Sequence, residues 1–436
     1  MNGQLVGTWS VDRGTHRFTY DAAWLSSPQR RALSLSLPIT PALEVRGPAV
    51  AHYFDNLLPD NEKIRERLAR RFKTGSADTF SLLEAIGRDC VGAVQLLPEG
   101  SAPSGWDRID SEPLTEAQIA ELLRAVPSES VLGLSGDDEL LRISLAGAQE
   151  KTALLHHRGR WHRPLGATPT THILKLPLGL VGGSRRVDLS DSVENEWLCA
   201  LILHQLGLPV APAEIWRFGD QKALAVTRFD RAWQQHDDGT PWIARLPQED
   251  FCQALGYPPS RKYEKDGGPR MADGLRLLAG SASSTDRATF ALTQLAFWLL
   301  AATDGHAKNF SIFLQPHDAY RMTPLYDVLS IFPYLGDAPN QFRWRKAELA
   351  MGVRSKNMHH HLHTLQARHW HGLAMQAGGA PVWARMRELV SSLAHALART
   401  ESHLPEGFPE RTWRAISNGL REQARRFEHG LAGVPA

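Results

Sequence analysis

One stretch of the sequence, residues 303–327, constrains the fold more than any other part of the chain. Within it, the segments 310–314 and 320–325 have the composition of short strands and are separated by turn-forming residues, which predicts a strand pair. A strand pair returns the chain to its starting point, so we expect Asp327 to lie beside Asn309. The carboxylate of Asp327 would therefore lie next to the loop that precedes the strand pair.

That loop begins with Asp304 and reaches Asn309 five residues later. In protein kinases this spacing occurs in the catalytic loop, where the Asp accepts the proton of the receiving hydroxyl and the Asn holds a magnesium ion. Asp, Gly and Asn are also ordinary turn residues, so either half of the pattern alone is compatible with a simple turn. Together with the strand pair and an apolar helix predicted at 290–300, the loop favours a site for proton and metal chemistry.

The composition sets outer limits on the function. The chain has 436 residues, enough for two or three domains, and its hydrophobic fraction of 42% and charged fraction of 22% are typical of globular proteins. The formal net charge is +2, so the whole-chain charge gives no case for binding nucleic acid or membranes. Cys90, Cys199 and Cys252 are scattered and fit reduced thiols. Because the N-terminus lacks a signal-peptide pattern and no apolar run reaches the roughly 20 residues of a membrane helix, we expect a cytoplasmic location.

Upstream of the loop, the sequence contains further parts of a nucleotide site. Two predicted strands flank a small-residue turn at 146–151, a form that lets backbone N–H groups approach phosphate oxygens but that an ordinary hairpin shares. The next predicted strand, 172–176, places Lys175 among aliphatic residues, where an ammonium group needs an anionic partner or a route to water. The following predicted helix carries Glu194 and Glu196, and the spacing does not decide which of them would face Lys175.

These parts occur in the order found in protein kinases: phosphate loop, lysine, acidic helix, connecting strand at 223–227, Asp/Asn loop and second Asp. We therefore predict an α+β, protein-kinase-like two-lobe fold with an extra small N-terminal α/β subdomain and a mostly helical C-terminal lobe. The expected division is an N-terminal subdomain at 1–105, a kinase N-lobe with the phosphate loop and the ATP lysine at 106–230, and a helical C-lobe with the catalytic loop at 231–436.

Local patterns elsewhere predict further elements. Short alternating segments at 5–9 and 33–37 are typical of strands, and Thr115 begins a capping box at the start of a helix. Helices at 61–72 and 411–426 carry several arginines each. A helix face exposed to solvent accounts for these arginines. In the C-terminal helix, they also offer a local patch for an acidic partner or the DNA backbone.

Along nearly its whole length the chain resembles the HipA family of bacterial serine/threonine-protein kinase toxins, which belong to type II toxin–antitoxin systems. The matching segments, in chain order, are 54–60 (FDNLLPD), 87–94 (GRDCVGAV), 144–152 (SLAGAQEKT), 171–177 (THILKLP), 245–250 (RLPQED) and 302–310 (ATDGHAKNF). Six such matches in one order cover both the predicted N-terminal subdomain and both predicted kinase lobes.

The resemblance implies an ATP- and Mg²⁺-dependent kinase that arrests growth by phosphorylating a translation protein of the aminoacyl-tRNA synthetase class, in the best-known member a glutamyl-tRNA synthetase. It also implies regulation by autophosphorylation at Ser144 and a HipB-like helix-turn-helix antitoxin, through which the chain would reach DNA as a corepressor. Two alternatives stay open: a small-molecule phosphotransferase, and a kinase-like corepressor without catalysis. The intact catalytic residues argue against corepression as the sole role.

By the same resemblance, Asp304 matches the catalytic base, Asn309 and Asp327 match the metal ligands, and Lys175 matches the ATP lysine. The nucleotide-binding residues expected in full are Ala146, Gly147, Ala148, Gln149, Glu150, Lys151, Lys175, Thr227, Arg228, Phe229, His306, Lys308, Asn309 and Tyr326. Thr227 departs from the family pattern, in which a Glu is expected. A hinge that contacts adenine through its backbone would tolerate this change.

Overall fold

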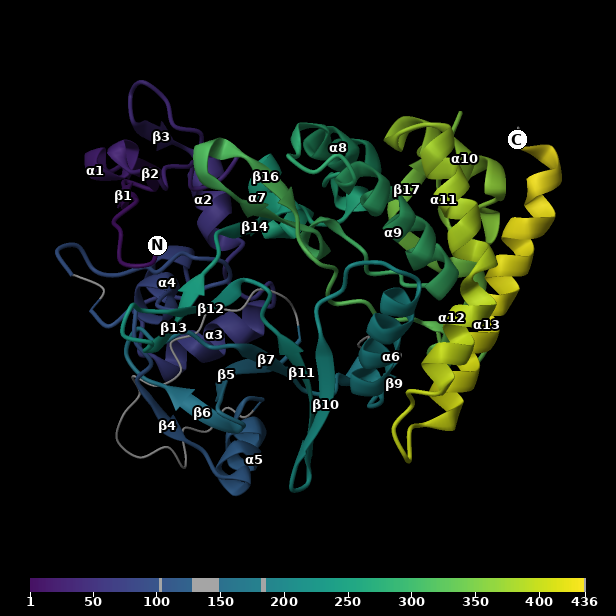
Figure 1. Ribbon diagram of the computed structural model, residues 1–436, viewed down its shortest axis with the longest axis horizontal. Coiled ribbons are helices and arrows are strands. Elements are labelled where there is room, and N and C mark those ends of the chain that lie inside the picture. The colour runs from purple at the N-terminus through teal and green to yellow at the C-terminus, as the bar shows by residue number, and fades with distance from the viewer. Residues whose placement is uncertain (102–103, 128–148, 182–185, 435–436) are drawn as a thin grey trace. The chain divides into compact units, whose positions relative to one another are not determined.

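Two structural units make up the chain in a computed structural model, which describes residues 1–101, 104–127, 149–181 and 186–434 (Figure 1). Unit 1 comprises Met1–Leu176, Trp216–Arg261 and Ser311–Tyr320, and unit 2 comprises Pro177–Ile215, Lys262–Phe310 and Arg321–Ala436. Each unit is thus assembled from segments that are distant in the sequence. The expected division at residues 105 and 230 stays a prediction.

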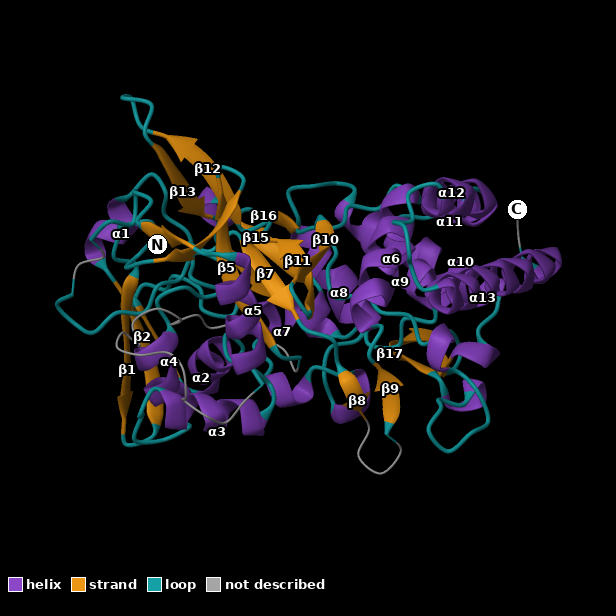
Figure 2. Cartoon of the chain, turned by 90° about the horizontal axis from the view of Figure 1, so that it is seen from below, coloured by secondary structure: helices purple, strands orange, loops and turns teal. Residues whose placement is uncertain are grey.

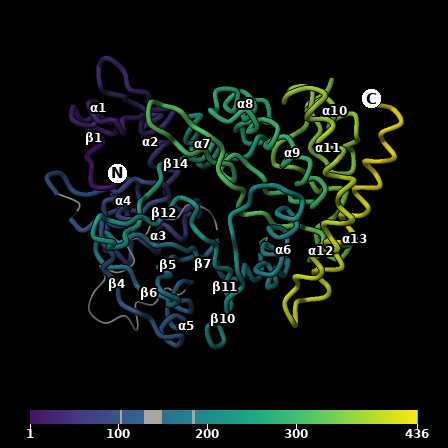
Figure 3. Tube along the Cα trace, in the orientation of Figure 1, coloured from purple at the N-terminus to yellow at the C-terminus, as the bar shows by residue number. Residues whose placement is uncertain are grey.

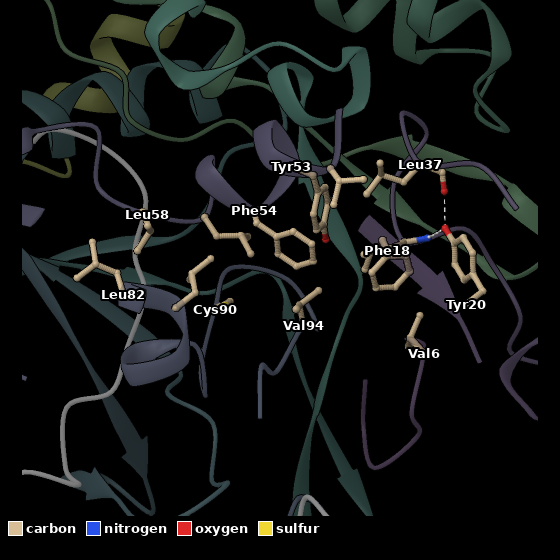
Figure 4. Packing of buried hydrophobic residues seen from close by; sticks show 14 of the residues in the cluster. Val6, Phe18, Tyr20, Leu37, Tyr53, Phe54, Leu58, Leu82, Cys90 and Val94 are labelled. Atoms are coloured by element: carbon tan, nitrogen blue, oxygen red, sulfur yellow. Dashed lines mark hydrogen bonds between the residues drawn. The ribbon is translucent and has the colours of Figure 1, made fainter. Parts of the chain in front are cut away.

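The N-terminal part of unit 1 is a small antiparallel sheet with four helices. The strands are β1 (Gly7–Asp12), β2 (Thr15–Tyr20) and β3 (Glu44–Arg46), and the helices are α1 (Ala22–Ser26), α2 (Pro48–Asp55), α3 (Glu62–Arg71) and α4 (Thr79–Ile86). Figure 4 shows the core of this part, in which Phe54 lies between Phe18 and Leu82. Phe54 meets Tyr53 edge-on, with ring centroids 5.1 Å apart. This apolar cluster holds the helices against the sheet.

The strand predicted at 33–37 is wrong. Ser34 and Leu37 instead form an isolated bridge that closes a turn, with Leu37 N donating to Ser34 O at 3.0 Å. The hydroxyl of Tyr20 donates to Leu37 O, as Figure 4 shows, and Ser34 Oγ donates to Gln253 O at 3.4 Å. The apolar alternation was misleading because side chains, rather than a neighbouring strand, satisfy the backbone groups of the segment: Tyr20 Oη accepts from Leu33 N, and Glu249 Oε1 accepts from Leu35 N.

A six-stranded sheet forms the second part of unit 1. Its order is β10-β11-β7-β5-β6-β4, with β4 (Ser111–Pro113), β5 (Lys151–His157), β6 (Arg160–Pro164), β7 (His172–Lys175), β10 (Ala213–Phe218) and β11 (Gln221–Thr227). The strands predicted at 152–155, 172–176 and 223–227 are therefore confirmed as β5, β7 and β11, and the strand predicted at 140–145 lies outside the described residues. The antiparallel register of β5 and β7 places Lys151 opposite Lys175, and that of β7 and β11 places His172 opposite Thr227.

Helix α5 (Glu116–Ala125) packs against this sheet. Ile119 and Leu123 belong to one buried cluster with Leu174 of β7. The helix begins with the predicted capping box, in which Thr115 Oγ1 accepts from Gln118 N at 3.3 Å. The remaining elements of unit 1 are β12 (Arg231–Gln235), β13 (Pro241–Arg245), β14 (Gln248–Asp250), α7 (Phe251–Leu255) and β15 (Ser311–Leu314), and β15 neighbours both β14 and β16 (Tyr320–Met322).

Unit 2 is mostly helical, as Figure 2 shows by colour and Figure 3 by the green-to-yellow trace of its C-terminal part. Its helices are α6 (Ser192–Gln205), α8 (Met271–Leu277), α9 (Asp286–Leu300), α10 (Ala367–Ala377), α11 (Ala380–Ser391), α12 (Leu393–Glu401) and α13 (Glu410–His429). Its strands are β8 (Gly179–Val181), β9 (Val187–Leu189), β17 (Glu348–Arg354) and β18 (Met358–His361).

Helix α9 is the centre of unit 2. Every residue from Phe290 to Leu300 is buried, and α10, α11 and α13 pack around it. The buried helix predicted at 290–300 is therefore confirmed, and its all-round burial explains why the apolar run shows no polar face. Among the described residues, no helix is long and apolar enough to cross a membrane.

Candidate active site

The loop that carries Asp304 starts where α9 ends in a left-handed residue. Ala301 has φ 49° and ψ 42°, and Ala302 N donates to Phe297 O at 2.8 Å. Gly305 lies so close to the ring of Phe297 that a Cβ there would be 2.3 Å from a ring carbon. Only glycine fits this close to Phe297, and the close packing fixes the turn against the buried helix α9.

Asp304 has a restrained backbone and an exposed carboxylate. Its carbonyl oxygen accepts from His306 N and from Asn309 Nδ2, each at 2.8 Å. The side chain of Asp304 is 60% exposed, whereas those of His306 and Asn309 are buried. The five-residue spacing thus closes a loop through the Asn309 amide. A carboxylate held in this way can meet an incoming hydroxyl, which is the geometric requirement for a general base.

Tyr263, which the sequence did not single out, also contacts Asp304. Its hydroxyl donates to Asp304 Oδ1 at 2.5 Å, and its ring meets that of His306 edge-on with centroids 4.9 Å apart. Ala307 N donates to Lys262 O at 3.2 Å, so the segment before Tyr263 runs along the loop. No local signal indicates this contact, because 41 residues separate Tyr263 from Asp304.

Asp327 reaches this region through its neighbour Tyr326. The Tyr326 hydroxyl donates to Lys308 O at 2.8 Å, which joins the residues immediately before Asp327 and Asn309. Asp327 has φ 62°, a left-handed conformation that Asp adopts more readily than most residues. His306 and Lys308, both expected to bind nucleotide, are buried in the loop.

Asn309 and Asp327 offer the oxygen donors that Mg²⁺ prefers. Because Asn309 Nδ2 donates to Asp304 O, the amide oxygen is the atom of Asn309 that suits a cation. Within the described ranges, no group of three or more His, Cys, Asp and Glu side chains could hold a metal ion. Mg²⁺ needs no such group, since it commonly keeps water and substrate phosphate oxygens among its ligands. The two residues therefore fit the role predicted for them.

In unit 1, two of the expected nucleotide-binding residues lie opposite each other. Lys151 of β5 pairs in register with Lys175 of β7, so their side chains leave the sheet on the same face. Lys175 is only 7% exposed. The expectation that these two residues bind nucleotide phosphate stays a prediction.

The residues just before β5 are fixed by their neighbours. Gln149 Nε2 donates to Leu176 O at 2.6 Å, and Leu176 N donates to Glu150 O at 3.2 Å. The carboxylate of Glu150 accepts from Arg67 of α3. The other members of the expected phosphate loop and the expected autophosphorylation site lie outside the described residues; they are Ser144, Ala146, Gly147 and Ala148.

The expected hinge follows β11. Thr227 Oγ1 and His172 Nε2 lie 3.3 Å apart, and the ring of Phe229 meets that of Phe313 edge-on with centroids 5.7 Å apart. Burial and, to a smaller extent, the neighbouring His156 lower the pKa of His172 to about 4. His172 is therefore neutral at pH 7. Depending on its tautomer, its Nε2 can donate a hydrogen bond to the Thr227 hydroxyl or accept one from it.

Arg228, the middle hinge residue, directs its side chain into unit 1. Its guanidinium donates to Asp230 Oδ2 and Cys90 O, both at 2.8 Å, and reaches Asp89 Oδ2 at 3.3 Å. Although burial alone would raise the pKa of the Asp89 carboxyl, the guanidinium groups of Arg231, Arg228 and Arg245 hold it well below its ordinary value. This buried network fixes the backbone of the hinge from inside.

The two glutamates predicted as candidate partners of Lys175 lie on one helix. Glu194 and Glu196 are both buried, and both belong to α6 of unit 2. Asp191 precedes this helix but makes no capping bond to it; its carboxylate accepts from Tyr334 Oη at 2.6 Å instead.

Comparison with known proteins connects this geometry to a family. The model of the HipA N-terminal domain matches residues 1–97, and that of the HipA-like C-terminal domain matches residues 143–401. A curated Sinorhizobium fredii (strain NBRC 101917 / NGR234) protein, "Putative kinase Y4mE", is 35% identical over 406 residues, 91% of this chain and 90% of that protein. The "Serine/threonine-protein kinase toxin HipA" of Shewanella oneidensis is 26% identical over 76% of this chain and 74% of its own length.

A solved structure supports the same fold. The HipA chain in the Shewanella oneidensis MR-1 complex of HipA, HipB and operator DNA superposes with a TM-score of 0.78. The alignment covers 98% of this chain and 96% of that chain, at 22% sequence identity. The predicted α+β, kinase-like fold is therefore confirmed. Because the two domain models together match most of its length, the chain belongs to the HipA family.

Proposed function

We propose that this protein is an ATP- and magnesium-dependent serine/threonine-protein kinase, and that it acts in the cytoplasm as the toxin of a toxin–antitoxin pair. Relatives are named as kinases, and the one from Shewanella oneidensis is named as a kinase toxin. The observation that supports the proposal most directly is the closed loop in which Asn309 holds the Asp304 carbonyl while the Asp304 carboxylate stays exposed.

In the proposed reaction, a serine or threonine hydroxyl gives its proton to Asp304 while its oxygen attacks the γ-phosphorus of ATP, and ADP leaves. Lys151 and Lys175 would hold phosphate oxygens on the face of the sheet that they share. Magnesium, with Asn309 and Asp327 as protein ligands, would supply further neutralisation of phosphate charge. The other proposed nucleotide contacts are Gln149, Glu150, Thr227, Arg228, Phe229, His306, Lys308 and Tyr326, together with Ala146, Gly147 and Ala148.

For Arg228, the contact with nucleotide would be indirect. Its guanidinium is occupied by Asp89 and Asp230, and its backbone N–H donates to Thr171 O at 2.9 Å. We therefore assign adenine recognition to the backbone on either side of Arg228, with Arg228 as the residue that holds that backbone in place. A backbone hinge also accommodates Thr227 in place of a Glu.

We further propose a HipB-like helix-turn-helix antitoxin as the partner, because the solved Shewanella oneidensis assembly contains HipA, HipB and operator DNA. The antitoxin would supply most DNA contacts, and the complex would repress transcription. Arginines of α13 are partly neutralised on their own helix, since Arg414 pairs with Glu410 at 2.5 Å and Arg425 pairs with Glu422 at 3.0 Å. We therefore expect the chain alone to bind DNA weakly.

The proposed protein substrate belongs to the aminoacyl-tRNA synthetase class. Purified protein would be incubated with labelled ATP and a whole-cell lysate, and the label would be located by mass spectrometry. Asp304→Asn is the control, because it keeps the shape of the side chain but removes the base. Label on a synthetase that is absent with Asp304→Asn would support the proposal. Label only on a small molecule would favour a phosphotransferase, and ATP binding without any transfer would favour a corepressor.

A further inference from the structure

Asn195 of α6 bridges both backbone groups of Ser330, which lies three residues after Asp327. Asn195 Nδ2 donates to Ser330 O at 2.8 Å, and Asn195 Oδ1 accepts from Ser330 N at 2.9 Å. Both residues are 0% exposed, and 135 residues separate them in the sequence. An amide side chain carries both a donor and an acceptor, so this one residue satisfies two buried backbone groups at once.

The residues that follow α6 hold the other end of the same segment, 325–330. Leu325 N donates to Pro209 O at 2.8 Å, and Leu325 O accepts from Ala211 N at 2.9 Å. These bonds belong to an isolated parallel bridge. The segment is therefore attached at both ends, on one side to α6 itself and on the other to the chain that leaves α6.

Asp327 lies between these two attachments in a left-handed conformation, with φ 62°. For a residue with a Cβ this conformation is unfavourable, and it persists where the surrounding structure holds the backbone on both sides. The direction in which the carboxylate leaves the chain is set by that backbone conformation. The position of the carboxylate therefore depends on the two attachments.

Ser330 also joins the segment to the end of α9. Its hydroxyl donates to Leu300 O at 2.6 Å, and Ile331 N donates to Ala301 O at 3.1 Å. The loop that carries the expected catalytic base begins at this same end of α9. One buried residue thus connects α6, the segment with the expected metal ligand and the start of the catalytic loop.

We propose that Asn195 is a positioning residue for the metal ligand Asp327: by fixing the backbone of Ser330, it holds the carboxylate where a magnesium ion can use it. Mg²⁺ demands a nearly ideal arrangement of its oxygen ligands, so a small displacement of one ligand lowers its affinity. This inference rests on the proposed function, because it takes Asp327 as a magnesium ligand. All the residues that carry it belong to unit 2.

The test measures the binding of magnesium with a non-hydrolysable ATP analogue, Mg-AMPPNP, by calorimetry. Asn195→Ala should weaken binding about tenfold, because the released segment lets Asp327 leave the position of a metal ligand. In EDTA, which removes magnesium, the variant and the unchanged protein should bind AMPPNP equally. Asn56→Ala is the matched control: it removes a buried amide of unit 1 that donates to Tyr257 O at 2.9 Å, and it should leave the gain from magnesium unchanged.

A double variant shows whether Asn195 acts through Asp327. Asn195→Ala combined with Asp327→Ala should bind Mg-AMPPNP within about twofold of Asp327→Ala alone, because the carboxylate that Asn195 positions is already absent. A general loss of structure would instead add to the effect of Asp327→Ala. Hydrogen exchange without ligand gives a second readout, in which the peptide 325–331 should exchange faster in Asn195→Ala than in Asn56→Ala.

If Asn195→Ala does not fold, Asn195→Ser takes its place. Its hydroxyl introduces no charge and can replace at most one of the two bonds to Ser330, so binding of Mg-AMPPNP should weaken at least about threefold.

Three results would overturn the inference. It fails if the folded Asn195 variant binds Mg-AMPPNP as tightly as the unchanged protein, if the double variant is clearly weaker than Asp327→Ala, or if the exchange of 325–331 stays the same. In each of these cases the unchanged protein still shows magnesium-dependent binding, so the proposed kinase function survives. Absence of magnesium-dependent binding by the unchanged protein would instead overturn the proposed function, and this inference with it.

Discussion

The hydroxyl of Tyr263 donates a hydrogen bond to Asp304 Oδ1 across 2.5 Å. Tyr263 is the contact that orients the carboxylate side chain, while His306 N and Asn309 Nδ2 hold the carbonyl of the same residue. One carboxylate oxygen is thereby fixed, and the other, Oδ2, lies 4.0 Å from His306 Nε2. In the proposed kinase, Oδ2 is the atom that would accept the substrate proton.

Tyr263→Phe should lower kcat about tenfold with little change in the KM for ATP. A hydrogen bond to a charged group is lost, and the carboxylate becomes free to rotate away from the substrate hydroxyl. The phenylalanine ring keeps the edge-on contact with His306, so the fold should persist. Steady-state phosphorylation assays measure both constants, with Tyr257→Phe as the matched control. An unchanged kcat would show that Tyr263 does not position the base.

Asp327→Ala should weaken the binding of Mg-AMPPNP by at least about tenfold, because the metal ion would lose a charged oxygen ligand. Binding measured in EDTA should be equally weak for the variant and the unchanged protein. Asp337→Ala, which removes an exposed carboxylate ten residues further on, serves as the control. Unchanged magnesium-dependent affinity of Asp327→Ala in calorimetry would remove Asp327 from the metal site.

Autophosphorylation at Ser144 should act as an off-switch. A phosphate adds roughly −1.5 to −2 charge, two residues before the segment to which we assign ATP phosphates, and would compete for the same donors. We expect one molecule to modify another, because Ser144 directly precedes the expected phosphate loop and would have to leave that segment to reach Asp304 of its own chain. Mixing Asp304→Asn protein with active enzyme should label the inactive protein at Ser144, and Ser144→Ala should prevent labelling. Phosphopeptide mapping without label at Ser144, or normal ATP binding by phosphorylated protein, would contradict this.

Glu249 of β14 should make the protein less stable as the pH rises. Desolvation in its buried site is the main cause that raises the pKa of Glu249 to about 8 from its ordinary 4.5, although Leu35 N donates to its carboxylate at 2.9 Å. Between about pH 4.5 and 8 the folded state therefore holds a proton that the unfolded state has released. Stability falls across this window as the pH rises, because the unfolded state binds fewer protons there.

Glu249→Gln should flatten this contribution and stabilise the protein near pH 8 by a few kcal/mol, on the order set by the size of the shift. The amide oxygen can still accept from Leu35 N. Urea unfolding at a series of pH values measures the effect, with the exposed Glu121→Gln as the control. Equal pH dependence of the variant and the unchanged protein between pH 5 and 8 would rule out Glu249 as the titrating group.

Local patterns in the sequence were sufficient for most of the elements around the site. The apolar run at 290–300 could form only a buried helix, the strand pair after Asn309 followed from turn residues at the right spacing, and Thr115 began its helix with the predicted capping box. Each of these depends on residues within one turn or one hairpin of each other. Propensity, periodicity and capping act over that range, so the sequence alone determines them.

Contacts between distant segments were decided only by the tertiary structure. Tyr263 meets Asp304 across 41 residues, Arg67 meets Glu150 across 83, and Arg228 meets Asp89 across 139. The strand predicted at 33–37 failed for the same reason, because the distant side chains of Tyr20 and Glu249 take its backbone hydrogen bonds. Hydrogen bonds and ion pairs act over a few ångströms in space and leave no periodic trace along the chain. The sequence therefore determined which chemical groups are present, and packing decided which of them meet.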